Sequence, residues 1–196
     1  MLQLGAVGLM LPAAERILAS PPEALAAPSL NDATLQAFAD TLIPGKRVAR
    51  TDLGHEIHPK AIAGVHPEPG AVQADSLLLY HHALIGFDLV APAFLADLAT
   101  RSLLRGGLFL DLPFAKRVAV CTDGLAPSNP TALVWELAAA VPSAAFLCSA
   151  TQKNATIDTA SGLQVMGHPG TAPQGYADYS YRRVLSAERT AQGNLP

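Results

Sequence analysis

Apolar residues recur at helical spacing along much of the chain, and they first do so clearly over residues 35–42. There the apolar side chains stand at i, i+3, i+4 and i+7, the stripe of an amphipathic helix. Asn31 and Asp32, just before the stripe, are good N-cap residues. Pro44 and Gly45 follow it and predict the end of this helix.

The segment from Asp75 to Val90 is apolar around most of its helical circumference, which predicts a central core helix. Pro92 then fits the first turn of a second helix, or a kink in one long helix, that runs to about Leu104. Gly106 and the glycine after it predict its end.

Two further helices are predicted in the third quarter of the chain. One begins near Asp111 and ends at Gly124. The other begins at Asn129, kinks near Pro142, and holds Trp135 in the core as its anchor.

Two segments lack a sustained period. Residues 46–73 carry repeated Gly and Pro and predict a long loop, a kind of segment that is usually functional or bound to a partner. Residues 154–196 are expected to form turns and short extended pieces. The predicted fold is mainly α: an irregular bundle of four to six helices with a long early loop and an extended C-terminal arm. The expected divisions are a signal-like segment (1–28), a helical domain (29–153) and a partner-binding arm (154–196).

Composition suggests that part of the surface is covered. Of the 196 residues, 50% are hydrophobic and 15% are charged, against the roughly 25% charged residues of an average soluble domain. Either the fold is compact or another molecule covers some of it. The net charge is -3 and no basic run is present, so nucleic-acid binding has little support.

The N-terminal apolar run, Leu4 to Leu11, is far shorter than the ~20 residues of a membrane-spanning helix. Residues 24–26 have the A-x-A form of a signal-peptidase site. The run resembles the apolar part of a twin-arginine export signal, but it lacks the arginine pair, so a cytoplasmic location is expected for the sequence as written. The alternative is a helix over residues 2–19 that packs on the domain or on a partner.

Histidines supply the main candidate chemistry. His55, His58 and His66 lie in the long loop and could form a zinc or iron site. The alternative is that they are solvated or contact a partner, because H-x-x-H spacing in a loop does not fix a ligand face. His81 has Asp88 seven residues further on, close to the same helix face, which allows a functional pair.

Other catalytic motifs are missing from the sequence. It has no G-x-S-x-G elbow, no G-x-G-x-x-G turn and no C-x-x-C-H haem motif, so neither a catalytic residue nor a cofactor is predicted for this chain. Cys121 and Cys148 lie in apolar runs and are expected to be buried thiols, with a disulfide between their helices as the alternative.

Residues 167–183, GHPGTAPQGYADYSYRR, combine helix breakers with aromatic and basic side chains. Tyr and Arg are enriched among interface anchors, and glycines let a backbone follow a partner's contour. The alternatives are an arm that folds back onto its own bundle, and disorder. The predicted partner-binding residues are His168, Tyr176, Tyr179, Tyr181, Arg182 and Arg183.

FADTLIPG, residues 38–45, resembles the opening helix of the gluconate 2-dehydrogenase subunit 3 family, and the tyrosine-rich tail resembles that of a related actinobacterial branch of unknown function. In that family the small subunit accompanies a large flavoprotein of the glucose-methanol-choline type. The resemblance therefore implies a non-catalytic accessory subunit that stabilises its partner and possesses no cofactor, with FAD in the partner. Two alternatives stay open: a stand-alone metal-dependent enzyme or cyclase that uses the loop histidines, and a helical protein that binds a small ligand.

Overall fold

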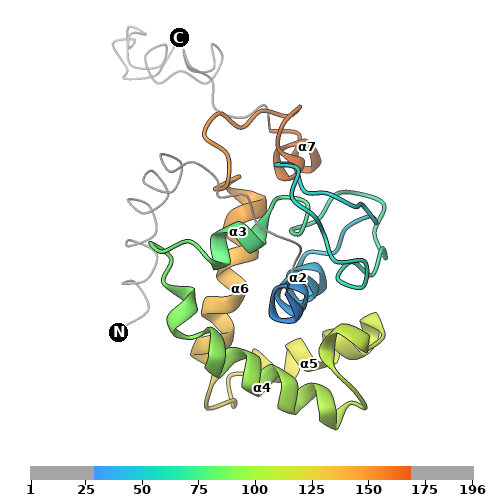
Figure 1. Ribbon diagram of the computed structural model, residues 1–196, viewed down its shortest axis with the longest axis vertical. Helices are drawn as coiled ribbons and strands as arrows, with labels where there is room; N and C mark the ends of the chain where they lie inside the picture. The colour runs from blue at the N-terminus through green and yellow to red at the C-terminus, as the bar shows by residue number, and fades with distance from the viewer. Residues whose placement is uncertain (1–28, 169–196) are drawn as a thin grey trace, which may run out of the picture.

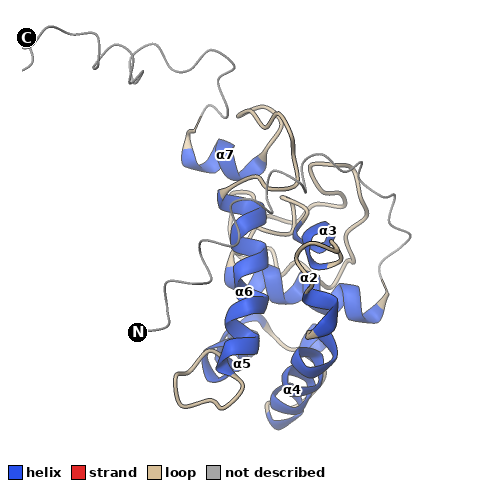
Figure 2. Ribbon diagram, turned by 90° about the vertical axis from the view of Figure 1, so that its left-hand side faces the viewer, coloured by secondary structure: helices blue, strands red, loops and turns tan. Residues whose placement is uncertain are grey.

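The computed structural model describes residues 29–168, and these are mainly helical, as predicted. They contain no β-strand, apart from one isolated bridge between Arg50 and Glu56 (Figure 2). Residues 169–196, most of the predicted arm, and residues 1–28 lie outside the described part. The helices are α2 (Leu30–Leu42), α3 (Ser76–Tyr80), α4 (Ala91–Leu104), α5 (Phe114–Gly124), α6 (Ala132–Leu147) and α7 (Ser161–Met166), with short 3-10 helices η1 (Phe87–Leu89) and η2 (Phe109–Asp111).

Helix α2 is the centre of the described domain and contacts α3, α5 and α6 (Figure 1). Its N-cap is Ser29, two residues before the predicted cap. The Ser29 hydroxyl accepts from the Asp32 N–H (3.2 Å), and the Asp32 carboxylate accepts from the Ser29 N–H (3.1 Å). This capping box satisfies two backbone donors at the helix start.

The core is built around three aromatic rings from three helices. Phe38, Phe94 and Trp135 pack edge to face, with ring centroids 4.8–5.8 Å apart. All three side chains are fully buried, and the predicted anchoring role of Trp135 is confirmed.

The predicted core helix over residues 75–90 is wrong in length. Helix α3 ends at Tyr80, and a turn and η1 follow before α4. Gly86 has φ 67°, a left-handed conformation that glycine adopts without steric cost and that no regular helix contains. Pro92 lies in the first turn of α4, as the first of the two predictions had it.

Helix α6 continues through Pro142, which has no N–H to donate to the carbonyl four residues earlier. That carbonyl belongs to Ala138, and it accepts a hydrogen bond from the buried Tyr80 hydroxyl at 2.8 Å. A side chain of α3 therefore replaces the backbone donor that α6 lacks.

The long loop is packed against the domain. Asp40, which is 1% exposed, accepts hydrogen bonds from the N–H groups of Gly45 and Ala63, at the two sides of the loop. Arg117, on α5, also holds the loop. Its guanidinium donates to the carbonyls of Lys60, Ala61, Leu110 and Leu112.

The expectation of an extended arm is wrong for residues 154–168. These residues include helix α7 and pack on the domain. The Asp52 carboxylate accepts from the Ser161 N–H (2.7 Å) and from its hydroxyl (2.6 Å). A Cβ on Gly162 would lie 1.8 Å from the Phe146 carbonyl oxygen, so glycine is required where α7 meets α6.

The two cysteines are free. Cys121 is buried as expected, and burial raises the pKa of its thiol to about 12. Cys148 is exposed, which contradicts the expectation of a second buried thiol. The alternative of a disulfide is likewise wrong.

Candidate functional site

Several leucines on the described surface are largely exposed. Leu89 is 88% exposed, Leu104 82% and Leu133 67%. Single exposed leucines are ordinary, whereas a contiguous exposed apolar patch marks an interaction surface. The other exposed large apolar residues include Leu30, Val65, Leu84, Leu103, Leu108, Val118, Leu137, Leu147, Ile157, Val165 and Met166.

The predicted partner-binding tyrosines and arginines, Tyr176 to Arg183, lie outside the described residues. His168 is the last described residue, and it is exposed. Its backbone N–H donates to the Leu163 carbonyl at 2.9 Å, so His168 is held at the end of α7.

The three loop histidines do not come together. His58 and His66 are each turned back on their own loop, where Nδ1 accepts from the N–H two residues on, of Lys60 and Glu68. Among residues 29–168, no group of three or more His, Cys, Asp or Glu side chains could hold a metal ion. The geometry therefore gives no support to the predicted zinc or iron site.

His55 instead belongs to a buried polar cluster beside α3. Its Nδ1 lies 2.8 Å from Asp75 Oδ2, and the Thr51 hydroxyl donates to the same oxygen at 2.6 Å. Asp75 is 1% exposed and has φ 64°, a strained backbone for a residue other than glycine. Burial raises the pKa of the Asp75 carboxyl, against the lowering effect of the hydrogen bonds from Thr51 and His55.

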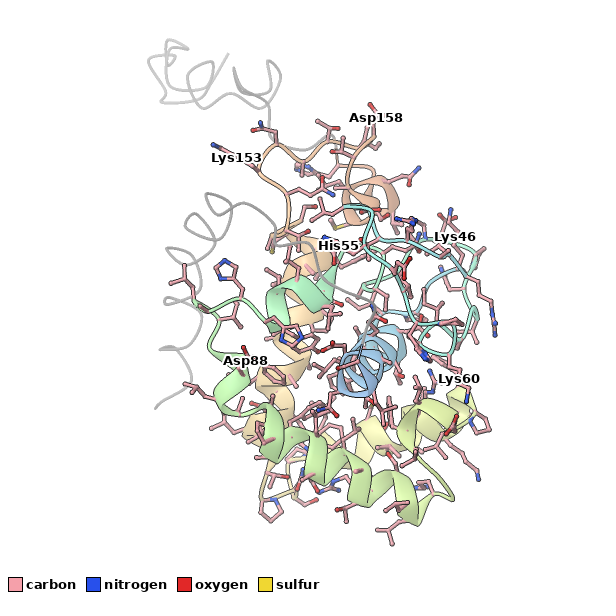
Figure 3. The ribbon with its side chains drawn as sticks, viewed as in Figure 1. Lys46, His55, Lys60, Asp88, Lys153 and Asp158 are labelled. Carbon is pink, nitrogen blue, oxygen red and sulfur yellow. The ribbon has the colours of Figure 1, made fainter. Side chains whose placement is uncertain are left out.

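Such a pair fixes the imidazole so that Nδ1 faces the carboxylate and Nε2 points elsewhere, an arrangement that suits proton transfer. Figure 3 shows His55 near α3 and α7, far from Asp88 beside α4 (Figure 3). The cluster also connects the long loop to the start of α3, because the hydrogen bond from Thr51 to Asp75 joins residues that are 24 positions apart in the sequence.

His81 lies between two carboxylates at a surface hollow of about 560 Å³. Its Nε2 is 2.8 Å from Asp32 Oδ1, and its Nδ1 is 3.3 Å from Asp88 Oδ1. The predicted pairing with Asp88 is present. The two residues do not share one α-helix, however, because His81 lies just after α3 and Asp88 lies in η1. The contact with Asp32 was not predicted. The hollow has an apolar wall of Leu35, Ala91, Pro92 and Leu95.

Asp32 is held in its charged form at this hollow. Burial would raise the pKa of its carboxyl, but the hydrogen bonds from Ser29 and His81 outweigh that effect and lower it. Two carboxylates beside an apolar wall can receive a protonated amine that carries an apolar body.

Within residues 29–168, no helix is both long and apolar enough to cross a membrane.

Comparison with known proteins places the chain in a family without assigning an activity. The sequence profile of a family of unknown function, DUF5987, matches residues 29–194, and so includes the tyrosine-rich tail but not the N-terminal apolar segment. No curated protein and no solved structure matches the chain significantly. The chain thus belongs to the DUF5987 family, whose function is unknown.

Proposed function

We propose that this chain is a non-catalytic small subunit that binds and stabilises a large FAD-dependent oxidoreductase subunit of the glucose-methanol-choline type. The FAD belongs to the partner. The proposal rests on the resemblance of residues 38–45 and of the C-terminal tail to the gluconate 2-dehydrogenase subunit 3 family and its relatives.

The exposed leucines are the observation that supports the proposal most. Side chains such as Leu89 and Leu104, more than four-fifths exposed, leave apolar area in water unless a second protein covers it. Covering such area stabilises a complex by about 25 cal/mol per Å² removed from water, before the costs of association are subtracted.

The tail supplies a second line of support. The family profile extends to residue 194, so the tail belongs to the family's shared sequence. It contains three tyrosines and two arginines between residues 176 and 183. Tyrosines bury a large apolar ring and keep a hydroxyl for hydrogen bonding, and arginines pair with carboxylates, so both types suit an interface.

The domain offers a firm base for such a tail. Helix α7 is attached to the loop through Asp52 and packs on α6 through Gly162. The chain continues into the tail two residues after α7 ends. We propose that the domain presents its apolar surface to the flavoprotein while the tail lies along the same partner.

Co-purification tests the proposal. The full chain is tagged in its native cell and purified, and the eluate is examined for a large protein with the absorbance of oxidised flavin. A variant without residues 169–196 should lose that protein, because the tail's anchors are absent. A variant without residues 1–28, which lie outside the family match, is the control and should retain it.

Two results would contradict the proposal. One is a chain that elutes without any flavoprotein although it is folded. The other is a flavoprotein that is retained equally by the full chain and by the variant without its tail, which would remove the tail from the interface.

A second candidate function, binding of a small ligand, is favoured by the hollow beside His81. Its two carboxylates and apolar wall suit a protonated amine such as hexylammonium. Hexylammonium should raise the thermal unfolding midpoint of the wild type, and less that of Asp88→Asn, whose side chain is 61% exposed. Equal shifts in the two proteins would contradict binding at this hollow.

A further inference from the structure

Helix α6 is apolar on the side that faces the core and also on the side that faces away from it. The inner side buries Trp135, Ala138, Val141, Pro142, Ala145 and Phe146. The opposite side, which we call the outer stripe, consists of Leu133, Leu137, Ala140, Ala144 and Leu147. Its three leucines are 39–67% exposed and its two alanines are half-buried, and Ala144, at the margin of the stripe, also packs against the core.

A helix that is apolar all round is normally buried on all sides. Figure 2 looks onto α6 along most of its length, and Glu136 is its one charged residue (Figure 2). Some molecule is therefore expected to cover the outer stripe.

The spacing of the outer stripe is that of a helix-pairing seam. Its residues are separated by four, three, four and three positions, the alternation found at the contact positions of coiled coils. The two alanines occupy the middle. Small residues there allow a second helix to approach to about 8 Å between axes, the near end of the usual range.

We propose that the outer stripe binds α6 of a second copy of this chain, with the two helices antiparallel. One register makes the stripe complementary to itself. In it Leu133 lies opposite Ala144 of the second copy, and Leu137 lies opposite Ala140 of the second copy. Each large side chain then meets a small one in all four layers, which is how closely packed seams fill space.

The same register accounts for the last residue of the stripe. Leu147 extends past the first turn of the other helix and reaches Pro130 of the second copy. Pro130 is exposed and lies just before α6. The contact is therefore apolar along the whole length of the helix, about 24 Å for its 16 residues.

An antiparallel pair also avoids two costs of a parallel one. It sets the helix macrodipoles in opposite directions, whereas a parallel pair aligns them. It also displaces the two copies of Glu136 along the seam, whereas a parallel pair would bring them side by side. A two-fold axis between the copies gives this arrangement directly, because both copies use the same patch.

This inference goes beyond the proposed function and does not depend on it. A dimer of this chain can exist whether or not a flavoprotein binds elsewhere. Other occupants of the stripe, such as residues 1–28 of the same chain or a different protein, are distinguished by the experiment below.

The experiment measures the mass of the purified full chain by light scattering after size exclusion. The wild type should have the mass of a dimer. Leu137→Glu and Ala140→Lys should each weaken dimerisation at least tenfold, because each places a charge in an apolar layer. Mixing the two variants should restore the dimer, because the introduced glutamate of one copy then faces the introduced lysine of the other, while the second layer of this kind stays wild type.

Two controls accompany the mixture. Leu104→Glu, at an exposed leucine on α4, should leave the dimer unchanged. Leu133→Gln with Leu147→Gln, at two positions that are each more than half exposed, should weaken the dimer without loss of helical circular dichroism, and so provides a second test if a charged variant misfolds.

The proposal is overturned by a monomeric wild type, which would leave the stripe to another occupant. A dimer that every outer-stripe variant retains would overturn it too, since the contact would then lie elsewhere. Failure of the two charged variants to recover the dimer when mixed, with both folded, would overturn the antiparallel register, because that register sets the two introduced charges directly opposite each other.

Discussion

Tyr80 and Pro142 solve one hydrogen-bonding problem together. Pro142 leaves the Ala138 carbonyl without its helical donor, and the Tyr80 hydroxyl supplies a replacement at 2.8 Å. The Tyr80 ring is fully buried, so water does not reach this carbonyl if the hydroxyl is lost.

We expect Tyr80→Phe to lower the free energy of unfolding by about 1–3 kcal/mol, the usual cost of an unsatisfied buried acceptor. In the Pro142→Ala background the same change should cost less, because the alanine N–H can donate to Ala138. Chemical denaturation of the four proteins in this cycle measures the coupling. Equal costs of Tyr80→Phe in the two backgrounds would contradict the account.

Asp97 joins α4 to α6. Its carboxylate accepts from the Trp135 indole N–H (2.8 Å), from the Thr131 hydroxyl (2.7 Å) and from Arg101. Burial would raise the pKa of this carboxyl, but the hydrogen bonds, led by that of Thr131, outweigh the effect and lower the pKa below its ordinary value of 3.8.

Asp97→Asn should therefore cost about 1.5–3 kcal/mol at neutral pH, the range for hydrogen bonds to a charged group. A lowered folded-state pKa gives stability that is fully present above pH 3.8 and is lost as the pH falls through the folded value, so the difference between wild type and variant should shrink in acid. Denaturation curves at several pH values measure this. Asp123→Asn, in a half-exposed pair with Arg105, is the control and should change stability by less than about 1 kcal/mol at any pH. If the stability difference between wild type and Asp97→Asn did not vary with pH, the charge of Asp97 would not be the source of its stabilising effect.

At the scale of elements, α7 depends on a residue far away in sequence. Ala160, its own N-cap residue, makes no side-chain cap, and Asp52 supplies the acceptors from 109 residues earlier. Asp52→Ala should release α7, since losing a cap costs about 0.5–2 kcal/mol and the helix has six residues.

Limited trypsin digestion measures that release through cleavage after Lys153, at the start of the segment that leads to α7. Cleavage should be faster in Asp52→Ala than in wild type. Asp158→Ala is the matched control, because Asp158 is exposed and lies in the same segment (Figure 3). Equal cleavage in the two variants would mean that Asp52 does not hold α7.

The same contrast explains which elements could be predicted from the sequence. Helices α2, α4, α5 and α6 show local signals, such as a periodic stripe or a proline in the first turn. Helix α7 was missed because its cap comes from the distant Asp52. The helix at α3 was predicted too long because a uniformly apolar segment does not reveal that the helix ends at Tyr80. Gly86, whose positive φ excludes one continuous helix, lies six residues further on.

The candidate site divides in the same way. The pairing of His81 with Asp88 could be predicted because the two residues are seven apart. Asp32 reaches the same ring from 49 residues away, and His55 finds Asp75 at a distance of 20 residues, contacts that no local pattern indicates. The tail's role stays a prediction.

At the scale of the whole molecule, the exposed leucines offer a test of whether this domain is self-sufficient or a subunit. Leu89 and Leu104 flank α4 at its two ends, and both are more than 80% exposed. A leucine that contacts nothing within its own chain contributes little to folding, so its replacement by a polar residue tests whether it is used in binding.

We expect Leu89→Gln with Leu104→Gln to leave the unfolding free energy within about 0.5 kcal/mol per site of wild type, as for surface substitutions generally. The same variant should lose the flavoprotein in co-purification if α4 belongs to the interface. Leu98→Gln, on the buried face of α4 at 1% exposure, is the opposite control and should destabilise the fold by about 2 kcal/mol or more, because it puts an amide in the core. A double variant that unfolds as easily as Leu98→Gln would show that these leucines pack within the chain, and a stable variant that retains the partner would move the interface away from α4.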